Sequence, residues 1–233
     1  MSGVAGPLVL VGPSGAGKTT VANELVSAHP DRFVPSVSVT TRRPRDGERH
    51  GRDYLFVSRA EFDEMIRGGR LAEWAEVHGE RYGTPADNLR EESGDGPVPV
   101  LDIDVLGAGR ILKRGTGALV IFILPPGPAE WIGRLAGRGT ESPREIARRL
   151  RTALGELRAV PLFERFVVNA ELDRTVRRVL AHWAGEPGGG ASASEVAARC
   201  RRLEDGARSE IARLEETEDP TTTNAERAPR ERE

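Results

Sequence analysis

The sequence predicts an α/β fold of three layers, in which a central parallel sheet lies between helices. Three observations lead to this prediction. Short apolar runs alternate with helical patterns, a glycine-rich turn follows the first apolar run, and a later apolar run ends in two aspartates. Alternation of this kind is typical of β–α–β units, because two parallel strands need a crossover connection that is usually a helix.

The glycine-rich turn belongs to the stretch from Leu8 to Thr20, which reads LVLVGPSGAGKTT. It fits the P-loop pattern G-x-x-x-x-G-K-[ST], and it has the strand before it and the helix after it that the pattern requires. Glycines allow consecutive backbone N–H groups to point inward, and the helix N-terminus adds partial positive charge, so the loop suits phosphates. We expect a nucleotide to contact Gly12, Pro13, Ser14, Gly15, Ala16, Gly17, Lys18, Thr19 and Thr20.

The lysine of this loop is unusual for the chain. Among 34 basic residues, only Lys18 and Lys113 are lysine. An ammonium group is a compact charge that fits against phosphate oxygens, whereas a guanidinium is wide and planar. We therefore expect Lys18 to reach the β- and γ-phosphates, and the Thr19 hydroxyl to ligate Mg²⁺.

Length and composition limit the possible classes of protein. The 233 residues are enough for one large α/β domain or two small ones, and a net charge of −2 suits neither nucleic acid nor an anionic membrane. No apolar stretch is long enough to span a bilayer, and the N-terminus does not resemble a signal peptide. The single Cys200 and four scattered histidines argue against disulfides and a zinc site. We expect a soluble, cytoplasmic enzyme.

Helical spacing and strand alternation place the other elements. The first helix should end near His29, because the residue before a proline avoids the α conformation. In the strand at Val98–Asp104, regular pairing should begin only at Val100, since Pro99 has no N–H to donate. Further helices are predicted at Ala60–Arg67, Val105–Lys113, Glu130–Leu135, Pro143–Leu157 and Leu172–Trp183. Another helix is predicted after a turn at Tyr82–Pro85, with Thr84 as its cap. Further strands are predicted at Val34–Val39, within Gly47–Ser58, and at Leu71–Val77, Ala118–Leu124 and Phe166–Val168.

Residues 38–89 contain only short predicted elements, so they form an insertion between the first helix and the next core strand. The insertion starts with the basic loop TTRRPR, in which Arg42, Arg43 and Arg45 lie beside two hydroxyls. Such a group would suit a phosphate. A solvated basic loop is the alternative.

Two aspartates, Asp102 and Asp104, end the core strand that follows. P-loop enzymes present a carboxylate to Mg²⁺ at this place. The alternative for either aspartate is capping of the next helix, which would explain one of them but hardly both.

The helices at Glu130–Leu135 and Pro143–Leu157 flank a glycine-containing turn, and the second helix is rich in arginine. Together they could form a mobile lid that brings positive charge over a transferring phosphoryl group. An exposed helix with salt bridges is the alternative, which fits Arg144 and Arg151 at least.

The composition changes after Gly185. The segment EPGGGASAS reads as a flexible linker, Ser194–Leu214 has a helical pattern, and the last residues are too polar to fold. Residues 185–233 hold 8 basic and 12 acidic residues, so this tail is acidic. It could pack on the body, mediate oligomerisation or stay free.

Taken together, these motifs resemble guanylate kinase, a P-loop nucleoside monophosphate kinase family. The resemblance rests on GPSGAGKTT, on VSVTTRRPRDGE followed by G-x-D-Y, and on LAEWAEVHG, YGT, LDID and LAGRGTE, in continuous order from about Pro7 to Trp183. It implies a guanylate kinase domain over residues 1–185, with a mixed α/β GMP-binding insert at about 37–90 and a helical lid at about 130–156. Residues 186–233 would be the linker, helix and disordered acidic tail.

The resemblance also implies an activity in purine nucleotide metabolism: Mg²⁺-dependent phosphoryl transfer from ATP to GMP, and to dGMP. Guanine offers two adjacent N–H donors that one carboxylate can accept, so Glu73 would separate guanine from adenine. GMP would contact Ser38, Arg42, Arg45, Tyr54 and Tyr82 around its phosphate, Glu73, Thr84 and Asp104 at its base, and Asp102. ATP and Mg²⁺ would involve Lys18, Thr19, Asp102, Arg134 and Arg138, and the catalytic group would be Lys18, Arg42, Arg138 and Arg149.

Three positions depart from the family pattern: Leu106 replaces a glutamine, Arg81 an aromatic residue and Ala170 an aspartate. None of the implied contacts is lost, so we expect activity. Two alternatives stay open. One is a guanylate-kinase-like interaction module without catalysis, and the other is a related kinase that phosphorylates a ribose bisphosphate. The oligomeric state is open as well.

Overall fold

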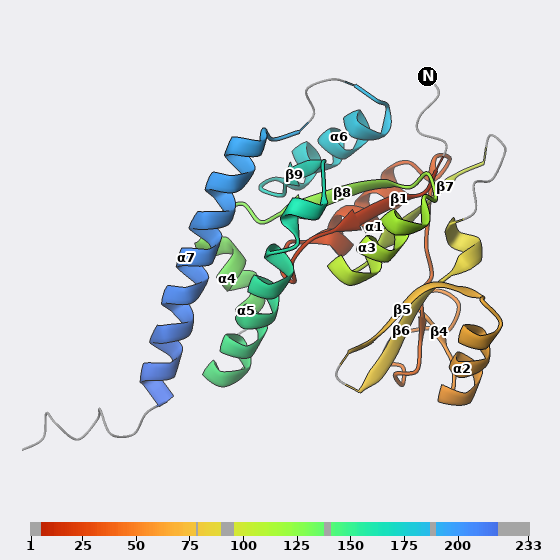
Figure 1. Ribbon diagram of the computed structural model, residues 1–233, viewed down its shortest axis with the longest axis horizontal. Helices are drawn as coiled ribbons and strands as arrows, with labels where there is room; N and C mark the ends of the chain where they lie inside the picture. The colour runs from red at the N-terminus through yellow and green to blue at the C-terminus, as the bar shows by residue number, and fades with distance from the viewer. Residues whose placement is uncertain (1–5, 78, 90–95, 138–140, 187–189, 219–233) are drawn as a thin grey trace, which may run out of the picture.

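A five-stranded parallel sheet forms the centre of the computed structural model, which describes residues 6–77, 79–89, 96–137, 141–186 and 190–218 (Figure 1). The strand order is β2-β7-β1-β8-β9. The strands are β1 (Leu8–Val11), β2 (Phe33–Pro35), β7 (Val98–Asp102), β8 (Leu119–Leu124) and β9 (Phe166–Val168). The predicted α/β fold with a central parallel sheet is confirmed.

Helices cover both faces of this sheet and complete the three layers. Side chains of β1 alternate between the faces, since Leu8 and Leu10 belong to one apolar cluster and Val9 and Val11 to the other. The cluster with Leu8 and Leu10 lies under α1 (Lys18–Ala28) and α6 (Leu172–Trp183). The cluster with Val9 and Val11 lies under α3 (Val105–Arg114), α4 (Pro128–Ala136) and α5 (Pro143–Leu157). A short 3-10 helix, η2 (Val160–Leu162), follows α5. All residues of β1 and β8 are buried, as expected of central parallel strands.

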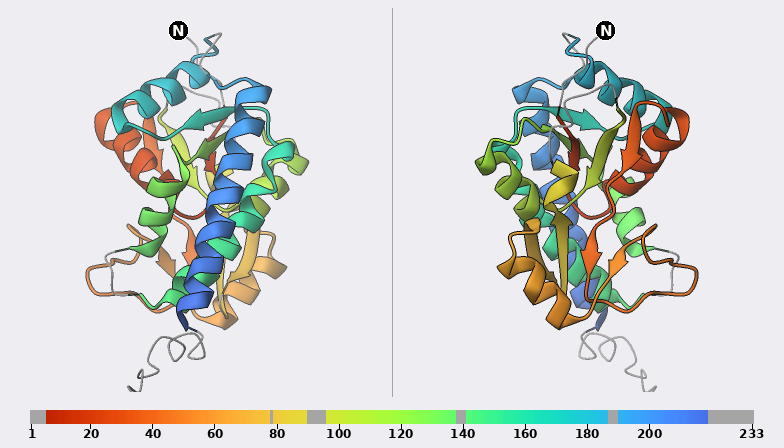
Figure 2. Two further views of the ribbon diagram at one scale, coloured as in Figure 1. Left: turned by 90° about the vertical axis from the view of Figure 1, so that its left-hand side faces the viewer. Right: turned by 90° about the vertical axis from the view of Figure 1, so that its right-hand side faces the viewer.

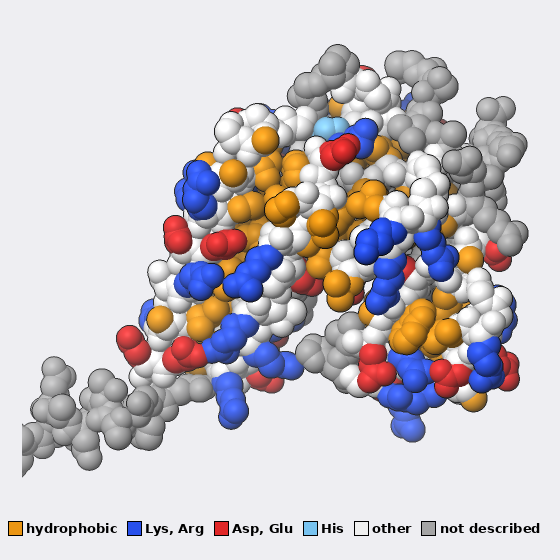
Figure 3. All heavy atoms as spheres, viewed as in Figure 1, with side chains coloured by type: hydrophobic (Ala, Val, Ile, Leu, Met, Phe, Trp, Pro, Cys, Tyr) orange, Lys and Arg blue, Asp and Glu red, His pale blue; other side chains and the backbone are white. Residues whose placement is uncertain are grey.

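The insertion has a sheet of its own, which is mixed and four-stranded, in the order β4-β3-β6-β5. Phe62 of the helix α2 is fully buried against Val39 and Leu71 of this sheet. The elements are β3 (Val39–Thr40), β4 (Leu55–Phe56), α2 (Arg59–Arg67), β5 (Leu71–Val77), β6 (Glu80–Pro85) and the 3-10 helix η1 (Ala86–Leu89). On the face drawn in Figure 3, a gap separates this insertion from the helix α5.

Two expected elements of this region are wrong. The strand expected at Val34–Val39 is two strands in different sheets, because the Ser36 N–H still donates to Val100 of the core whereas Val39 pairs with Gly83 of the insertion. In the described residues no α-helix follows Tyr82–Pro85, because those residues pair with β5 as the strand β6 and the 3-10 helix η1 comes next; residues 90–95 lie outside the described residues. Thr84 does not cap a helix; its hydroxyl donates to Glu73 on the neighbouring strand.

The proline in β7 has a different effect on its two sides. Pairing with β1 begins at Val100, as expected, whereas pairing with β2 already begins at Val98, which was not expected. Neighbouring residues of a strand direct their N–H groups to opposite sides. The Val98 N–H donates to Arg32 on the β2 side, so the donor that Pro99 lacks faces the other side, before β1 begins.

The last described helix, α7 (Ala193–Glu218), packs along α5 and α4 (Figures 1 and 2). Its buried Leu203, Ala207 and Leu214 belong to the same apolar cluster as α4 and α5, and Glu215 forms an ion pair with Arg151 of α5. The end expected to be disordered begins at Thr217, but Thr217 and Glu218 are the last residues of α7, so the expectation is wrong for these two residues. Residues 219–233 and part of the expected linker lie outside the described residues. In the described part of the chain no helix, α7 included, has the length and apolarity to cross a bilayer.

A glycine brings α7 close to α4, and this contact gives a stability prediction. A Cβ at Gly206 would lie 2.4 Å from the Cβ of Pro128, whereas a Cβ at Gly155 of α5 would meet nothing within 4 Å. Gly206→Ala should lower the free energy of unfolding by about 1–3 kcal/mol through overpacking. Gly155→Ala should raise it by about 0.5–1 kcal/mol through helix propensity. Denaturant unfolding of both variants tests this, and equal effects would contradict the packing of α7 on α4.

Candidate active site

The P-loop joins β1 to α1 and borders a cavity of about 630 Å³, here called the P-loop cavity. Gly17 has φ 86°, and a Cβ there would lie 2.4 Å from the Asn169 side chain, so only glycine fits. Lys18 Nζ donates to the Gly12 carbonyl at 2.9 Å. Of the residues predicted to contact ATP, this cavity is lined by Ser14, Gly15, Gly17, Lys18, Thr19, Thr20 and Arg134.

The other predicted P-loop residues shape the loop. Pro13 and Gly12 offer their carbonyls to Lys18, and the Pro13 carbonyl also accepts the Ala16 N–H at 3.0 Å. The Ala16 carbonyl accepts Asn169 Nδ2 at 2.8 Å and Arg134 Nη1 at 3.4 Å. These bonds fix the curled backbone that the glycines permit.

Asp102 ends β7 beside the P-loop, and its Oδ2 accepts a hydrogen bond from the Thr19 hydroxyl. Burial raises the pKa of Asp102, whereas the charge of Lys18 and the Thr19 bond lower it. The residue contacts α1 rather than capping α3. The two residues predicted to hold Mg²⁺ are therefore direct neighbours with oxygen donors.

A second cavity, of about 260 Å³, lies where the insertion meets β7, and is here called the insert cavity. It brings together residues that are far apart in the sequence. Its lining includes Ser38, Tyr54, Glu73, Tyr82, Asp102 and Asp104, all of which are predicted to contact GMP. Asp104 also caps α3, because its Oδ1 accepts the Gly107 N–H at 2.7 Å, so the capping alternative holds for this aspartate alongside its place in the cavity.

Glu73 is a buried carboxylate in this cavity, with 8% of the side chain exposed. Its Oε1 accepts the hydroxyl of the buried Thr84 at 2.7 Å, and its Oε2 lies 3.9 Å from Arg110 Nη1. Burial raises the pKa of Glu73, and the charge of Asp104 adds to that, whereas Thr84 and Arg110 oppose it. A Cβ at Gly107 would lie 2.9 Å from Oε2, so a glycine in α3 gives Glu73 its room. Glu73 is therefore not a solvated surface carboxylate.

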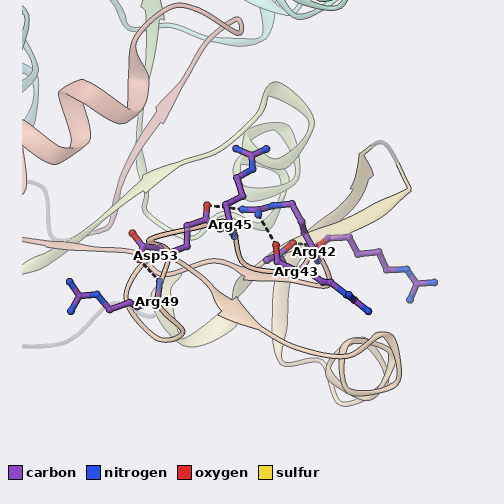
Figure 4. A network of polar contacts seen from close by, with 8 residues as sticks. Arg42, Arg43, Arg45, Arg49 and Asp53 are labelled. Carbon is purple, nitrogen blue, oxygen red and sulfur yellow. Dashed lines mark hydrogen bonds and ion pairs between the residues drawn. The ribbon is translucent and has the colours of Figure 1, made fainter.

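In the basic loop, Arg42 is the arginine held in place (Figure 4). Its Nη2 lies 2.9 Å from Glu48 Oε1, and its guanidinium lies 5.4 Å from the centre of the Tyr54 ring. The Arg45 backbone N–H donates to Glu48 Oε2 at 2.7 Å, while its side chain is exposed. The side chain of Arg43 extends away from this group in Figure 4. In the basic loop, the guanidinium of Arg42 is therefore held beside Tyr54 of the insert cavity, whereas the side chains of Arg43 and Arg45 are exposed.

The arginines of the predicted lid differ in where they lie. Arg134 of α4 lines the P-loop cavity and donates to the Asn169 carbonyl at 3.3 Å. Arg149 of α5 donates to the Leu135 carbonyl at 2.8 Å and pairs with Glu141, so it ties α5 to α4 and lies outside the cavities described above. Arg138 lies outside the described residues.

Two polar side chains at the P-loop were not predicted. Glu156 of α5 accepts the Ser14 N–H at 2.7 Å, and burial raises the pKa of this carboxyl. Asn169 follows β9 and lines the P-loop cavity. The place of Asn169 after a parallel strand is a signal that ligand residues often share. Glu156 has no such signal, because it occurs in a helix with many charged residues.

The three departures from the family pattern have different surroundings. Leu106 is 65% exposed, and Arg81 pairs with Asp63 and, at 3.6 Å, with Glu76. Ala170 lines the P-loop cavity. Only Ala170 therefore lies at one of the two cavities.

Known proteins resemble this chain along most of its length. The guanylate kinase family model matches residues 5–182. The guanylate kinase of Streptomyces coelicolor is 46% identical over 173 residues, covering 74% of this chain and 87% of that protein, and that of Nocardia farcinica is 47% identical over 176 residues, covering 75% and 91%. The crystal structure of guanylate kinase from Anaplasma phagocytophilum aligns with a TM-score of 0.63 at 31% identity, covering 88% of this chain and 98% of that one. The helix α7 lies beyond the family match.

Proposed function

Because this chain belongs to the guanylate kinase family, we propose that it transfers the γ-phosphoryl group of ATP to GMP, and to dGMP. One observation supports the proposal most strongly. Thr19, which lines the P-loop cavity, donates a hydrogen bond to Asp102, which lines the insert cavity. The two cavities therefore adjoin at the point where a phosphoryl group would pass from one nucleotide to the other.

We assign the donor ATP to the P-loop cavity. The loop N–H groups and the N-terminus of α1 favour anionic phosphates, and Lys18, which lines the cavity, would add its ammonium charge there. Arg134 would lie over the bound nucleotide from α4. The remaining predicted arginines, Arg138 and Arg149, would approach when α4 and α5 close.

The residues present fit a magnesium ion. Mg²⁺ prefers oxygen ligands and usually takes one or two from the protein, with phosphates and water supplying the rest. The Thr19 hydroxyl and the Asp102 carboxylate are two such ligands in direct contact. Mg²⁺ held there would neutralise charge on the phosphates.

We assign the acceptor GMP to the insert cavity. Glu73 would accept the guanine N1–H and exocyclic amine, with Thr84 orienting the carboxylate through its 2.7 Å bond and Asp104 beside it. The phosphate would lie toward Ser38, Tyr54 and Tyr82, which line the cavity, and toward Arg42, which lies against the Tyr54 ring. The side chain of Arg45, which is exposed, would turn toward the same phosphate.

Phosphoryl transfer requires alignment and charge neutralisation more than covalent chemistry, because its transition state is loose. Lys18 and Arg42 would supply positive charge from the two sides of the transferred group, and Arg138 and Arg149 from the lid. Closure would also exclude water, which would otherwise accept the phosphoryl group in place of GMP.

The substrate assignment is tested by a coupled assay for ADP with GMP, dGMP, AMP and ribose 1,5-bisphosphate as acceptors. We expect turnover with GMP and dGMP and, at most, weak turnover with AMP. High activity on ribose 1,5-bisphosphate would favour the alternative kinase, although the buried Glu73 favours a purine. No turnover with any acceptor, together with no binding of ATP, would favour the interaction module.

Glu73 also gives a prediction on pH. Burial raises its pKa above the ordinary value of 4.5, so it takes up a proton at a higher pH than an exposed glutamate. A protonated carboxyl cannot accept both guanine donors. The KM for GMP should therefore rise as the pH falls toward this raised pKa. Glu73→Gln should lack this component, which separates it from titration of the GMP phosphate; an identical pH profile in the two proteins would contradict the assignment.

A further inference from the structure

A third cavity, lined by residues of α6 and α7, has not been assigned above. Its volume is about 460 Å³, within the range of about 300–1,000 Å³ that is typical of ligand pockets. Four arginines line it, Arg174 and Arg178 from α6 and Arg199 and Arg202 from α7. We call it the arginine cavity.

The side chains of these arginines have few direct polar partners inside the protein. Among the described residues, Arg174, Arg178 and Arg202 form no hydrogen bond and no ion pair, and Arg199 donates only to the carbonyl of Pro126. Guanidinium groups that converge on one cavity without acceptors are a potential binding site for an anion.

Two carboxylates, Glu171 and Glu195, also line the cavity. Glu195 is engaged at the N-terminus of α7, where Oε2 accepts the backbone N–H of Ser192 at 2.8 Å and its hydroxyl at 2.7 Å. Four guanidiniums and two carboxylates leave a formal charge of +2 in the lining. A ligand that balances this charge carries at least two negative charges.

The neighbouring groups respond to this positive field. The pKa of His182 is lowered, first by burial and then by the charges of Arg165 and Arg178. The pKa of Arg199 is also lowered, by burial and then by the charge of Arg202. Positive charge is thus concentrated at the junction of α6 and α7 beyond what its carboxylates neutralise.

We propose that the arginine cavity binds a small oligophosphate anion between α6 and α7. Guanidiniums that approach from two helices suit tetrahedral phosphate groups, which offer acceptor oxygens in several directions, better than planar carboxylates. Half of the arginines come from α7, beyond the residues that match the family, so the cavity is complete only with this helix. The inference does not rest on the proposed function.

The test is calorimetric titration of the full chain with tripolyphosphate at fixed ionic strength. The P-loop also attracts phosphates, so the titration is made in the Lys18→Ala variant as well as in the unchanged protein. We expect binding in both. Added to Lys18→Ala, Arg174→Gln combined with Arg202→Gln should weaken binding at least about tenfold, since two charge-assisted contacts are lost. These two arginines are exposed, so the double variant should fold.

The matched control is Arg177→Gln combined with Arg208→Gln. Both residues are exposed and lie on the same two helices, but neither lines the cavity. We expect less than a twofold change. Three results would overturn the proposal: no binding in the Lys18→Ala variant, equal weakening by both double variants, or citrate binding as tightly as tripolyphosphate.

Bound tripolyphosphate should also raise the melting temperature, because a ligand that binds only the folded state stabilises it by mass action. The increase should persist in the Lys18→Ala variant and disappear when Arg174→Gln and Arg202→Gln are added to Lys18→Ala. An increase that survives in that triple variant would locate the anion elsewhere.

Discussion

Lys18→Ala should lower kcat/KM for phosphoryl transfer at least about a hundredfold, the scale expected when one charge-stabilising donor is removed. Among the described residues, Lys18 Nζ bonds only to the Gly12 and Pro13 carbonyls of its own loop, at 2.9 and 3.4 Å, so the fold should persist. The measurement is steady-state turnover of ATP with GMP, with circular dichroism as a check of folding.

The sequence contains its own control for this experiment. Lys113, the only other lysine, is exposed in the last turn of α3, away from the residues that line the P-loop cavity. Lys113→Ala should keep full turnover. A folded Lys18→Ala protein with the turnover of the unchanged protein would rule out a role for Lys18 at the phosphates.

Glu73→Gln should lower kcat/KM for GMP about 30- to 150-fold while changing the KM for ATP little. A glutamine keeps the acceptor for Thr84, but its amide NH₂ would face a guanine donor, and leaving such groups unpaired costs roughly 2–3 kcal/mol. Discrimination between GMP and AMP should fall in parallel.

Glu76 provides the comparison on the same strand. It is exposed and lies 3.6 Å from Arg81, so Glu76→Gln removes the same charge outside the insert cavity. Kinetics with GMP and AMP should match those of the unchanged protein. If Glu73→Gln keeps the GMP preference of the unchanged protein, guanine is recognised elsewhere.

The central sheet could be predicted because its signals are local. The strands β1 and β8 are apolar in every residue, since both of their faces are covered. The P-loop could be predicted because its glycines stand where a side chain would clash with neighbouring residues. The bounds of β5, β9, α5 and α6 also agree with the sequence pattern.

The errors arose where pairing partners decide the structure. Val34 and Val39 belong to one alternating stretch of sequence, yet they pair in different sheets, and alternation carries no information about the partner. Thr84 looked like a helix cap because threonine often caps, but its hydroxyl donates to a glutamate eleven residues away.

The residues of the site also differ in whether a local sequence signal or a distant contact places them. Lys18, Thr19 and Asp102 could be located by motif, because strand ends of a parallel sheet share one edge. Glu73 could be singled out only through the family resemblance, since its burial depends on Thr84 and Gly107 of other elements. Glu156 was missed because its contact with Ser14 spans 142 residues of sequence.

The most direct test of two adjoining nucleotide sites follows the phosphoryl group itself. The purified chain would be incubated with Mg²⁺, GMP and ATP labelled in the γ-phosphate, and the products separated. We predict that the label appears in GDP in amounts equal to the ADP formed, and that it stays in ATP when GMP is omitted. Label found as inorganic phosphate with GMP present, or no transfer at all, would contradict the account.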